Sequence, residues 1–138
     1  MSIRVLLLAD THLGFDLPTK PRVVRRRRGR DFQASYEAAL VPALEGEVDL
    51  VIHGGDVFHR PRVPPSLAFQ AFEPLRRVAE AGVPVFLVPG NHERSKLPHL
   101  RFAAHPLIRV FDRPRTFRVG VRGTNVAVAG FPYQRRIR

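Results

Sequence analysis

Three short polar groups in the sequence contain the residue types that bind metal ions. They are Asp10-Thr11-His12, Gly54-Gly55-Asp56 and Gly90-Asn91-His92-Glu93, and each follows an apolar run. Asp10 and His12 are two residues apart, so in an extended segment both side chains point to the same side and can share one ion. The Asp56 carboxylate has two oxygens and can bridge two cations, while Asn91 offers an amide oxygen. These residues predict a metal centre.

The ligand chemistry narrows the choice of metal. The chain has no cysteine, so only oxygen and nitrogen atoms are available. Mixed oxygen and nitrogen ligation without sulfur favours manganese(II), iron or zinc over calcium or magnesium. His92 stands beside Asn91 either as a further ligand or as a proton donor to the substrate.

Each polar group also has a purely structural explanation when it is taken alone. Asp10 could begin a turn, Asp56 could accept hydrogen bonds from turn amides, and Asn91 could adopt the left-handed conformation beside Gly90. The three groups nevertheless occur in order, each just beyond a predicted strand. That regularity favours one common site.

Two other histidines lie near the second group. His53 falls within a predicted strand and is expected to be a buried residue that orients a metal ligand. His59 lies beyond Asp56 and is expected near the substrate. Neither is assigned as a metal ligand.

The elements that must position these groups form a βαβαβ pattern. Apolar runs predict three strands, over residues 3–9, 48–52 and 84–88. Apolar residues at helical spacing predict two intervening helices, one capped by Asp31 and ended by Gly46, the other begun by Pro65 and ended by Gly82. If the strands are parallel neighbours, the three polar groups converge on one rim of an α/β sheet, where such sheets bind ligands.

The rest of the chain is less regular, and we expect it to belong to the same single domain, 1–138. Residues 99–106 predict a short helix or turn, and short strands are predicted over 108–111, 117–121 and 126–130. The last two strands should pair across Arg122-Gly123-Thr124. Here the pattern changes from parallel crossover units to a meander.

The charge of the chain favours a polyanionic partner. The formal net charge is +11, and 23 residues are lysine or arginine. Clustered cations gain free energy on nucleic acid by releasing counterions. Arg25, Arg26, Arg27 and Arg28 are candidate phosphate contacts, although such a run is also typical of a solvated loop. The arginine bias and the 13 prolines are equally typical of a thermophile.

The apolar run from Val5 to Ala9 is too short for a signal sequence or a membrane span. We therefore expect a cytoplasmic protein with no membrane association. The lack of cysteine agrees with a reducing compartment.

The three polar groups resemble the D-x-H, G-D and G-N-H-[DE] motifs of the calcineurin-like metallophosphoesterases. The longer stretches 10–14 and 53–58 resemble the DNA double-strand-break-repair branch, the SbcD-like exonuclease subunits. The resemblance implies a four-layer α/β/β/α sandwich, of which this chain forms the βαβαβ start with an incomplete second sheet. It also implies that Asp10 and His12 hold one metal, Asp56 bridges, Asn91 binds the second, and His92 is catalytic.

The function that the resemblance implies is hydrolysis of DNA phosphodiesters by a hydroxide that two divalent transition metals activate, with manganese(II) first and iron or zinc as alternatives. The enzyme would be an exonuclease or endonuclease of DNA repair, and His59 and the arginine run would contact substrate. DNA, a coiled-coil ATPase and a second copy of the chain are the expected partners. The alternatives are a phosphatase or nucleotide phosphodiesterase, or a catalytically incomplete DNA-binding or docking module.

The sequence departs from the family pattern after His92. The family continues with a further histidine and a G-H-x-H motif, whereas only His99 and His105 remain here. We therefore expect the 138 residues to be the N-terminal portion of a longer protein, and to be inactive or weakly active alone.

Overall fold

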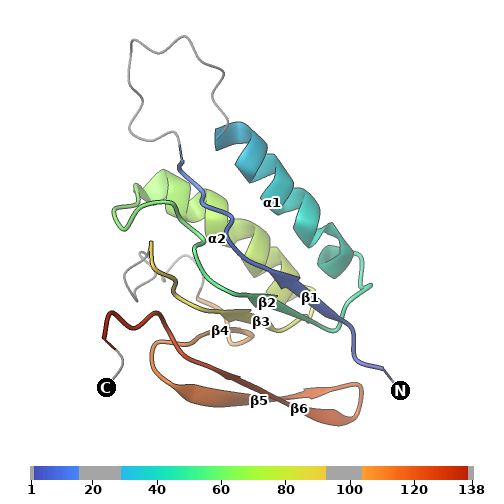
Figure 1. The fold of residues 1–138 in the computed structure, drawn as a ribbon. Coiled ribbons are helices and arrows are strands. Elements are labelled where there is room, and N and C mark those ends of the chain that lie inside the picture. The colour runs from blue at the N-terminus through green and yellow to red at the C-terminus, as the bar shows by residue number, and fades with distance from the viewer. Residues whose placement is uncertain (1, 16–28, 93–103, 137–138) are drawn as a thin grey trace, which may run out of the picture.

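The computed structural model describes residues 2–15, 29–92 and 104–136. Its centre is a four-stranded parallel sheet of order β1-β2-β3-β4 (Figure 1). The strands are β1 (Val5–Leu8), β2 (Leu50–His53), β3 (Val85–Leu87) and β4 (Ile108–Val110). The predicted α/β class and βαβαβ order are therefore confirmed.

The register of the sheet brings the ends of the first three strands level. Leu8 of β1 pairs with His53 of β2, and His53 pairs with Leu87 of β3. Because the strands are parallel, the three loops that follow them leave the sheet at the same edge. The polar groups predicted from the sequence lie in those loops.

Two helices cover one face of the sheet (Figure 1). They are α1 (Gly29–Leu44) and α2 (Pro65–Glu80), and Pro65 begins α2 as predicted. The Tyr36 hydroxyl joins them by donating to the Ala71 carbonyl at 2.6 Å. The prediction that Asp31 caps α1 is wrong, because the helix begins two residues earlier; Asp31 instead lies in its first turn, where a carboxylate still favours the helix dipole. Within the described residues, neither helix is long and apolar enough to cross a membrane.

A β-hairpin covers part of the opposite face. It consists of β5 (Arg115–Val121) and β6 (Thr124–Gly130), paired antiparallel as predicted. Arg122 and Gly123 have φ of 50° and 76°, the conformation of a tight two-residue hairpin turn. The hairpin packs on the sheet through one apolar cluster, formed by Leu50, Phe86, Phe111, Phe117 and Val121. The described residues thus form helix, sheet and hairpin layers.

The placement of β4 in a meander is wrong. β4 pairs parallel with β3 and extends the main sheet. The physical reason is that this segment has apolar groups for both faces: Ile108 and Val110 pack on the helix side, and Phe111 packs on the hairpin side. A strand covered on both faces suits a parallel sheet.

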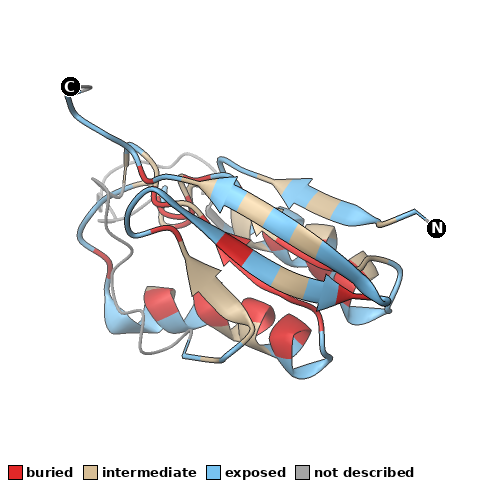
Figure 2. Ribbon diagram, turned by 90° about the horizontal axis from the view of Figure 1, so that it is seen from below, coloured by how far each residue is buried: buried red, intermediate tan, exposed pale blue. Residues whose placement is uncertain are grey.

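Strand β1 is the least covered strand of the main sheet. Leu6 and Leu8 pack against the core under the helices. On the other face, Val5 is 47% exposed and Leu7 is 70% exposed. Figure 2 shows this alternation along β1 beside the hairpin. The sheet therefore presents apolar surface at its β1 edge.

Candidate metal centre

The loops after β1 and β2 run side by side beyond the ends of their strands. The Asp10 amide donates to the Gly55 carbonyl at 2.9 Å, the His12 amide to the Asp56 carbonyl at 3.0 Å, and the Leu13 amide to the Val57 carbonyl at 2.8 Å. These hydrogen bonds continue the pairing of the sheet into the loops. They fix the first two polar groups relative to each other.

The backbone at this site adopts a conformation that most residues avoid. The φ angles of Asp10, His12 and Asp56 are 56°, 44° and 54°. The prediction that Asp10 and His12 lie in an extended segment is therefore wrong, although their side chains do reach the same side. A left-handed residue with a side chain costs roughly 1 to 2 kcal/mol. The loop hydrogen bonds hold the three residues in this conformation.

Asp10, His12 and Asp56 form the first group of side chains that could hold a metal ion, here called the carboxylate group. His12 Nε2 lies 3.7 Å from Asp10 Oδ1 and 3.9 Å from Asp56 Oδ2. These distances are too long for hydrogen bonds. The three ligand atoms lie within 4.8 Å of one another, so a single ion between them can reach all three.

The loop after β3 joins the site through the Asp56 side chain. The His92 amide donates to Asp56 Oδ1 at 2.9 Å. Gly90 permits this approach, because a Cβ there would lie 2.3 Å from Asp56 Oδ1 and 2.5 Å from its backbone nitrogen. Thus the third polar group meets the second, as the strand register requires.

His92 and Asn91 occupy the end of this third loop. His92 Nδ1 lies 2.7 Å from the His59 carbonyl oxygen. A carbonyl only accepts, so His92 Nδ1 carries a proton, and a neutral ring has its lone pair on Nε2. Asn91 is exposed beside it. Its assignment as a ligand stays a prediction.

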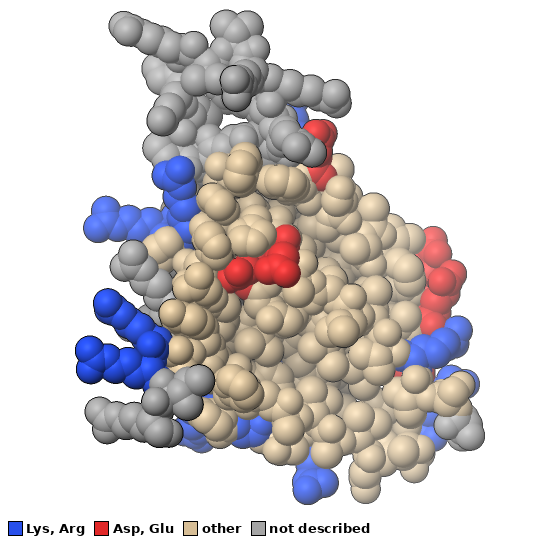
Figure 3. Space-filling model, viewed as in Figure 1, with Lys and Arg blue, Asp and Glu red and all other residues tan. Residues whose placement is uncertain are grey.

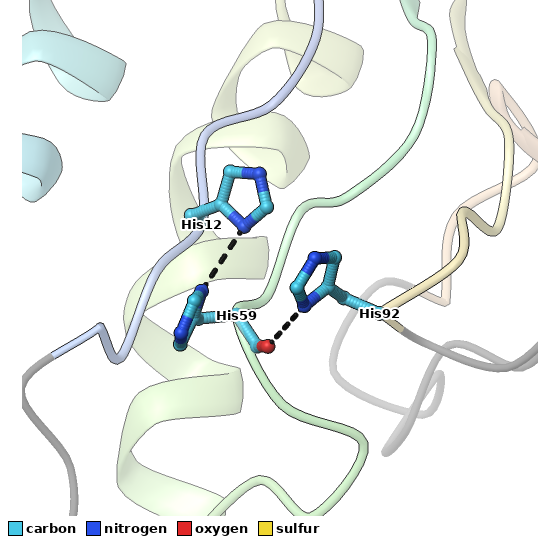
Figure 4. Close-up of side chains that lie close together, drawn as sticks. All are labelled: His12, His59 and His92. Atoms are coloured by element: carbon cyan, nitrogen blue, oxygen red, sulfur yellow. Dashed lines mark hydrogen bonds between the residues drawn. The ribbon is translucent and has the colours of Figure 1, made fainter.

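Sequence analysis expected His59 near the substrate, but it did not anticipate the contacts of His59 with His12 and His92. Its Nδ1 lies 3.2 Å from His12 Nδ1, and its ring stacks on that of His92 with centroids 5.1 Å apart (Figure 4). Burial lowers the pKa of His59, and the nearby positive charges of His12, His92 and Arg60 lower it further. The only sequence signal was its place three residues after Asp56.

The sequence model of calcineurin-like phosphoesterases matches residues 3–132 of the chain. The chain belongs to this phosphoesterase family. That finding confirms the family to which the three polar groups pointed, and it covers the hairpin as well as the parallel sheet.

Two relatives of this phosphoesterase are each named DNA double-strand break repair protein Mre11. The protein from Haloferax volcanii is 39% identical over 95 residues, which are 67% of this chain and 20% of the relative. The protein from Aeropyrum pernix is 32% identical over 138 residues, covering 93% of this chain and 32% of the relative. The matches confirm the resemblance to the double-strand-break-repair branch. The chain spans about a fifth to a third of the length of these two relatives.

In this phosphoesterase, His53 at the end of β2 connects the loops that follow β1 and β2. Its Nδ1 accepts a hydrogen bond from the Gly55 amide at 3.2 Å, so its proton is on Nε2, which faces Thr11 Oγ1 at 3.0 Å. The Thr11 hydroxyl in turn donates to the Val57 carbonyl at 3.0 Å. The prediction that His53 is buried is confirmed.

We predict that His53 makes the stability of the phosphoesterase depend on pH. Burial lowers its pKa from 6.5 to about 4, so the unfolded state binds the extra proton between these values. The contribution is complete above pH 6.5 and is lost as pH falls toward 4; its full size is roughly 3 kcal/mol. Thermal unfolding of His53→Gln between pH 7.5 and 5 should therefore show a flatter decline than wild type. Equal slopes would contradict this assignment, and His105→Gln serves as the control.

Some candidate residues lie outside the described part of the phosphoesterase. They are the arginine run 25–28, Glu93 and His99. His105 is described: its Nδ1 accepts from the Leu107 amide at 3.1 Å, in the turn before β4. Of the predicted site residues, the structure brings together Asp10, His12, Asp56, His59 and His92.

Proposed function

We propose that this phosphoesterase is a metal-dependent DNA nuclease of DNA repair. The observation that carries the proposal is the convergence of Asp10, His12 and Asp56 from two loops, with ligand atoms close enough to share an ion. The names of the relatives support DNA repair as the setting. A cytoplasmic location and a coiled-coil ATPase partner belong to the same proposal.

The donor set fits divalent transition metals, because it combines carboxylate oxygens with imidazole nitrogen. We assign Asp10 and His12 to one metal, Asp56 to a bridge and Asn91 to the second, with manganese(II) as the first choice. Such a pair, when bound, lowers the pKa of a shared water and neutralises charge on phosphoryl oxygens. The two oxygens of Asp56 face different loops, because Oδ1 accepts the His92 amide and Oδ2 faces His12, and this arrangement supports the proposed bridge.

His92 is proposed to act on the substrate. Its backbone amide donates to Asp56 Oδ1 and its ring Nδ1–H donates to the His59 carbonyl. These two hydrogen bonds fix the direction of Nε2. In the protonated ring, Nε2–H is available to donate to the leaving oxygen. These two contacts support the proposal that His92 is a proton donor beside the carboxylate group.

A DNA substrate agrees with the distribution of charge. The chain has a formal net charge of +11. On the face in Figure 3, a small acidic group lies near the middle, and basic side chains gather toward the left edge. Basic side chains gathered on one side of this face suit contact with a polyanion. The exposed apolar edge of β1 is proposed to meet a protein partner or a second copy.

We predict that the arginine run contributes to binding of DNA. Replacing Arg25 to Arg28 with serine should weaken DNA binding equally for all sequences and flatten its dependence on salt, because fewer counterions are released. The measurement is the salt slope of DNA affinity. Hydrolysis of a small chromogenic phosphodiester should hardly change. An unchanged salt slope of DNA affinity would indicate that the arginine run is a solvated loop that does not contact DNA.

The direct test of the proposed function compares two substrates in manganese(II) and in chelator. We expect cleavage of double-stranded DNA that requires the metal and that is weak for the 138-residue chain. Cleavage of the small phosphodiester alone would favour the phosphodiesterase alternative. DNA binding by a chain with no affinity for manganese(II) would favour the docking module.

A further inference from the structure

His12 faces two different sets of ligands through its two ring nitrogens. Its Nε2 points to the carboxylate group, 3.7 Å from Asp10 and 3.9 Å from Asp56. Its Nδ1 lies 3.2 Å from His59 Nδ1 (Figure 4). A neutral imidazole has only one lone pair, so His12 can ligate an ion on one side at a time.

The set on the Nδ1 side consists of His12, His59 and His92, here called the imidazole group. Its three ligand atoms also lie within 4.8 Å of one another. Two nitrogens on one tetrahedral zinc ion, each about 2.0 to 2.1 Å from the metal, are about 3.3 Å apart. The 3.2 Å between the two Nδ1 atoms is close to that spacing. The third ring is held beside them by stacking on His59.

We propose that the imidazole group is a second metal site, which takes zinc or a similar borderline divalent ion and competes with the carboxylate group for His12. Three neutral imidazoles favour zinc, nickel or copper, whereas carboxylates favour manganese. The three ligands leave a fourth position for water. The inference rests on the proposed function, because both metal sites use His12. It implies that zinc in the imidazole group lowers the affinity of the carboxylate group for manganese.

The proton on His12 determines which site is formed. When Nε2 ligates a metal in the carboxylate group, the proton is on Nδ1 and donates to His59 Nδ1. When zinc occupies the imidazole group, that proton must move to Nε2, where the carboxylates of Asp10 and Asp56 stabilise it. His59 needs no change, since its Nδ1 lone pair already faces His12. The exchange therefore costs one tautomer change.

The first test is the imidazole ¹⁵N spectrum of the labelled protein with one equivalent of zinc. We expect the signals of Nδ1 of His12 and Nδ1 of His59 to shift to values for metal-bound nitrogen, and Nε2 of His12 to become protonated. Zinc bound to His12 Nε2, with the His59 signals unchanged, would overturn the proposal, because the ion would then occupy the carboxylate group.

The second test compares two substitutions of His59 by titration with zinc and with manganese. His59→Ala should weaken zinc binding by about tenfold or more, because it removes a zinc ligand, and it should also weaken manganese binding, because it removes the acceptor of His12 Nδ1–H. His59→Gln keeps an acceptor for His12 Nδ1–H but is a poor zinc ligand, so it should restore manganese affinity and not zinc affinity. If both metals weaken together and glutamine restores both, His59 only positions His12 and the proposal fails.

A reciprocal control separates this inference from the proposed function. Asp10→Asn should weaken manganese binding much more than zinc binding, because Asp10 is a proposed ligand in the carboxylate group and only a neighbour of the His12 Nε2 proton when zinc is bound. Far-UV circular dichroism verifies that each variant is folded, and the ¹⁵N spectrum of wild type needs no variant. Loss of both metals in Asp10→Asn would overturn the second site. That result would not affect the proposed manganese site, which is tested separately by the dependence of manganese binding on Asp56. The two proposals can therefore fail independently.

Discussion

Asp56→Asn is expected to remove tight manganese binding and metal-dependent hydrolysis together. The substitution takes away the charge of the carboxylate that faces His12, while an asparagine oxygen can still accept the His92 amide bond that Asp56 Oδ1 accepts at 2.9 Å. The φ of 54° at this position is one that asparagine tolerates well. Affinity should fall by more than the roughly 10- to 100-fold that loss of an outer-shell partner costs.

The measurement is manganese titration by calorimetry, followed by hydrolysis of DNA and of a small phosphodiester. Asp112→Asn is the matched control, because Asp112 is an exposed carboxylate whose ion pair within the described residues is with nearby Arg115, at 3.3 Å. Its affinity and activity should equal those of wild type. Wild-type manganese affinity in Asp56→Asn would show that the carboxylate group is not the metal site.

Gly90→Ala is expected to damage the site and the fold at once. A methyl group at this position would lie 2.3 Å from Asp56 Oδ1, far inside van der Waals contact, and 2.5 Å from the Asp56 backbone nitrogen. Forcing extra atoms into a packed region costs typically 1 to 3 kcal/mol, about the cost we expect here. The Asp56 side chain must move, so manganese affinity should also fall by about tenfold or more.

Gly120→Ala provides the control for this substitution. A Cβ at Gly120 meets no atom within 4 Å, so the change should leave the midpoint of thermal unfolding and manganese affinity nearly unaltered. Thermal unfolding and metal titration of both variants give the comparison. A Gly90→Ala protein that matched Gly120→Ala in both measurements would show that the contact between the two loops is unimportant.

Sequence alone was sufficient to predict the first three strands of the parallel sheet and the rim at which they end. The apolar runs before Asp10, Asp56 and Gly90 are local signals, and parallel pairing brings the ends of successive strands together. The same reasoning misplaced β4, because the choice between pairing with β3 and joining the hairpin depends on which faces are already covered. Which faces are covered depends on the tertiary packing, and the local sequence of this segment does not reveal it.

The details of the site were less predictable for a related reason. His59 approaches His12 across 47 residues and holds His92 across 33, contacts that depend on the course of two loops. The left-handed backbone of Asp10 and His12 likewise results from the hydrogen bonds between loops. Residue types indicated which groups meet. Loop geometry decides which nitrogen of each ring faces which partner.

The left-handed backbone at Asp10, His12 and Asp56 has a consequence for protein engineering. Glycine adopts positive φ at little cost, so glycine at any of the three would relieve about 1 kcal/mol or more in metal-free protein. A library selected for heat resistance without metal would therefore enrich glycine at the three positions that we propose as metal ligands. Selection in the presence of the bound ion reverses this preference, because a ligand that binds only the native state stabilises it, and the stabilisation grows with the logarithm of the ion concentration above the Kd. The conditions of selection thus decide whether the engineered chain keeps its chemistry.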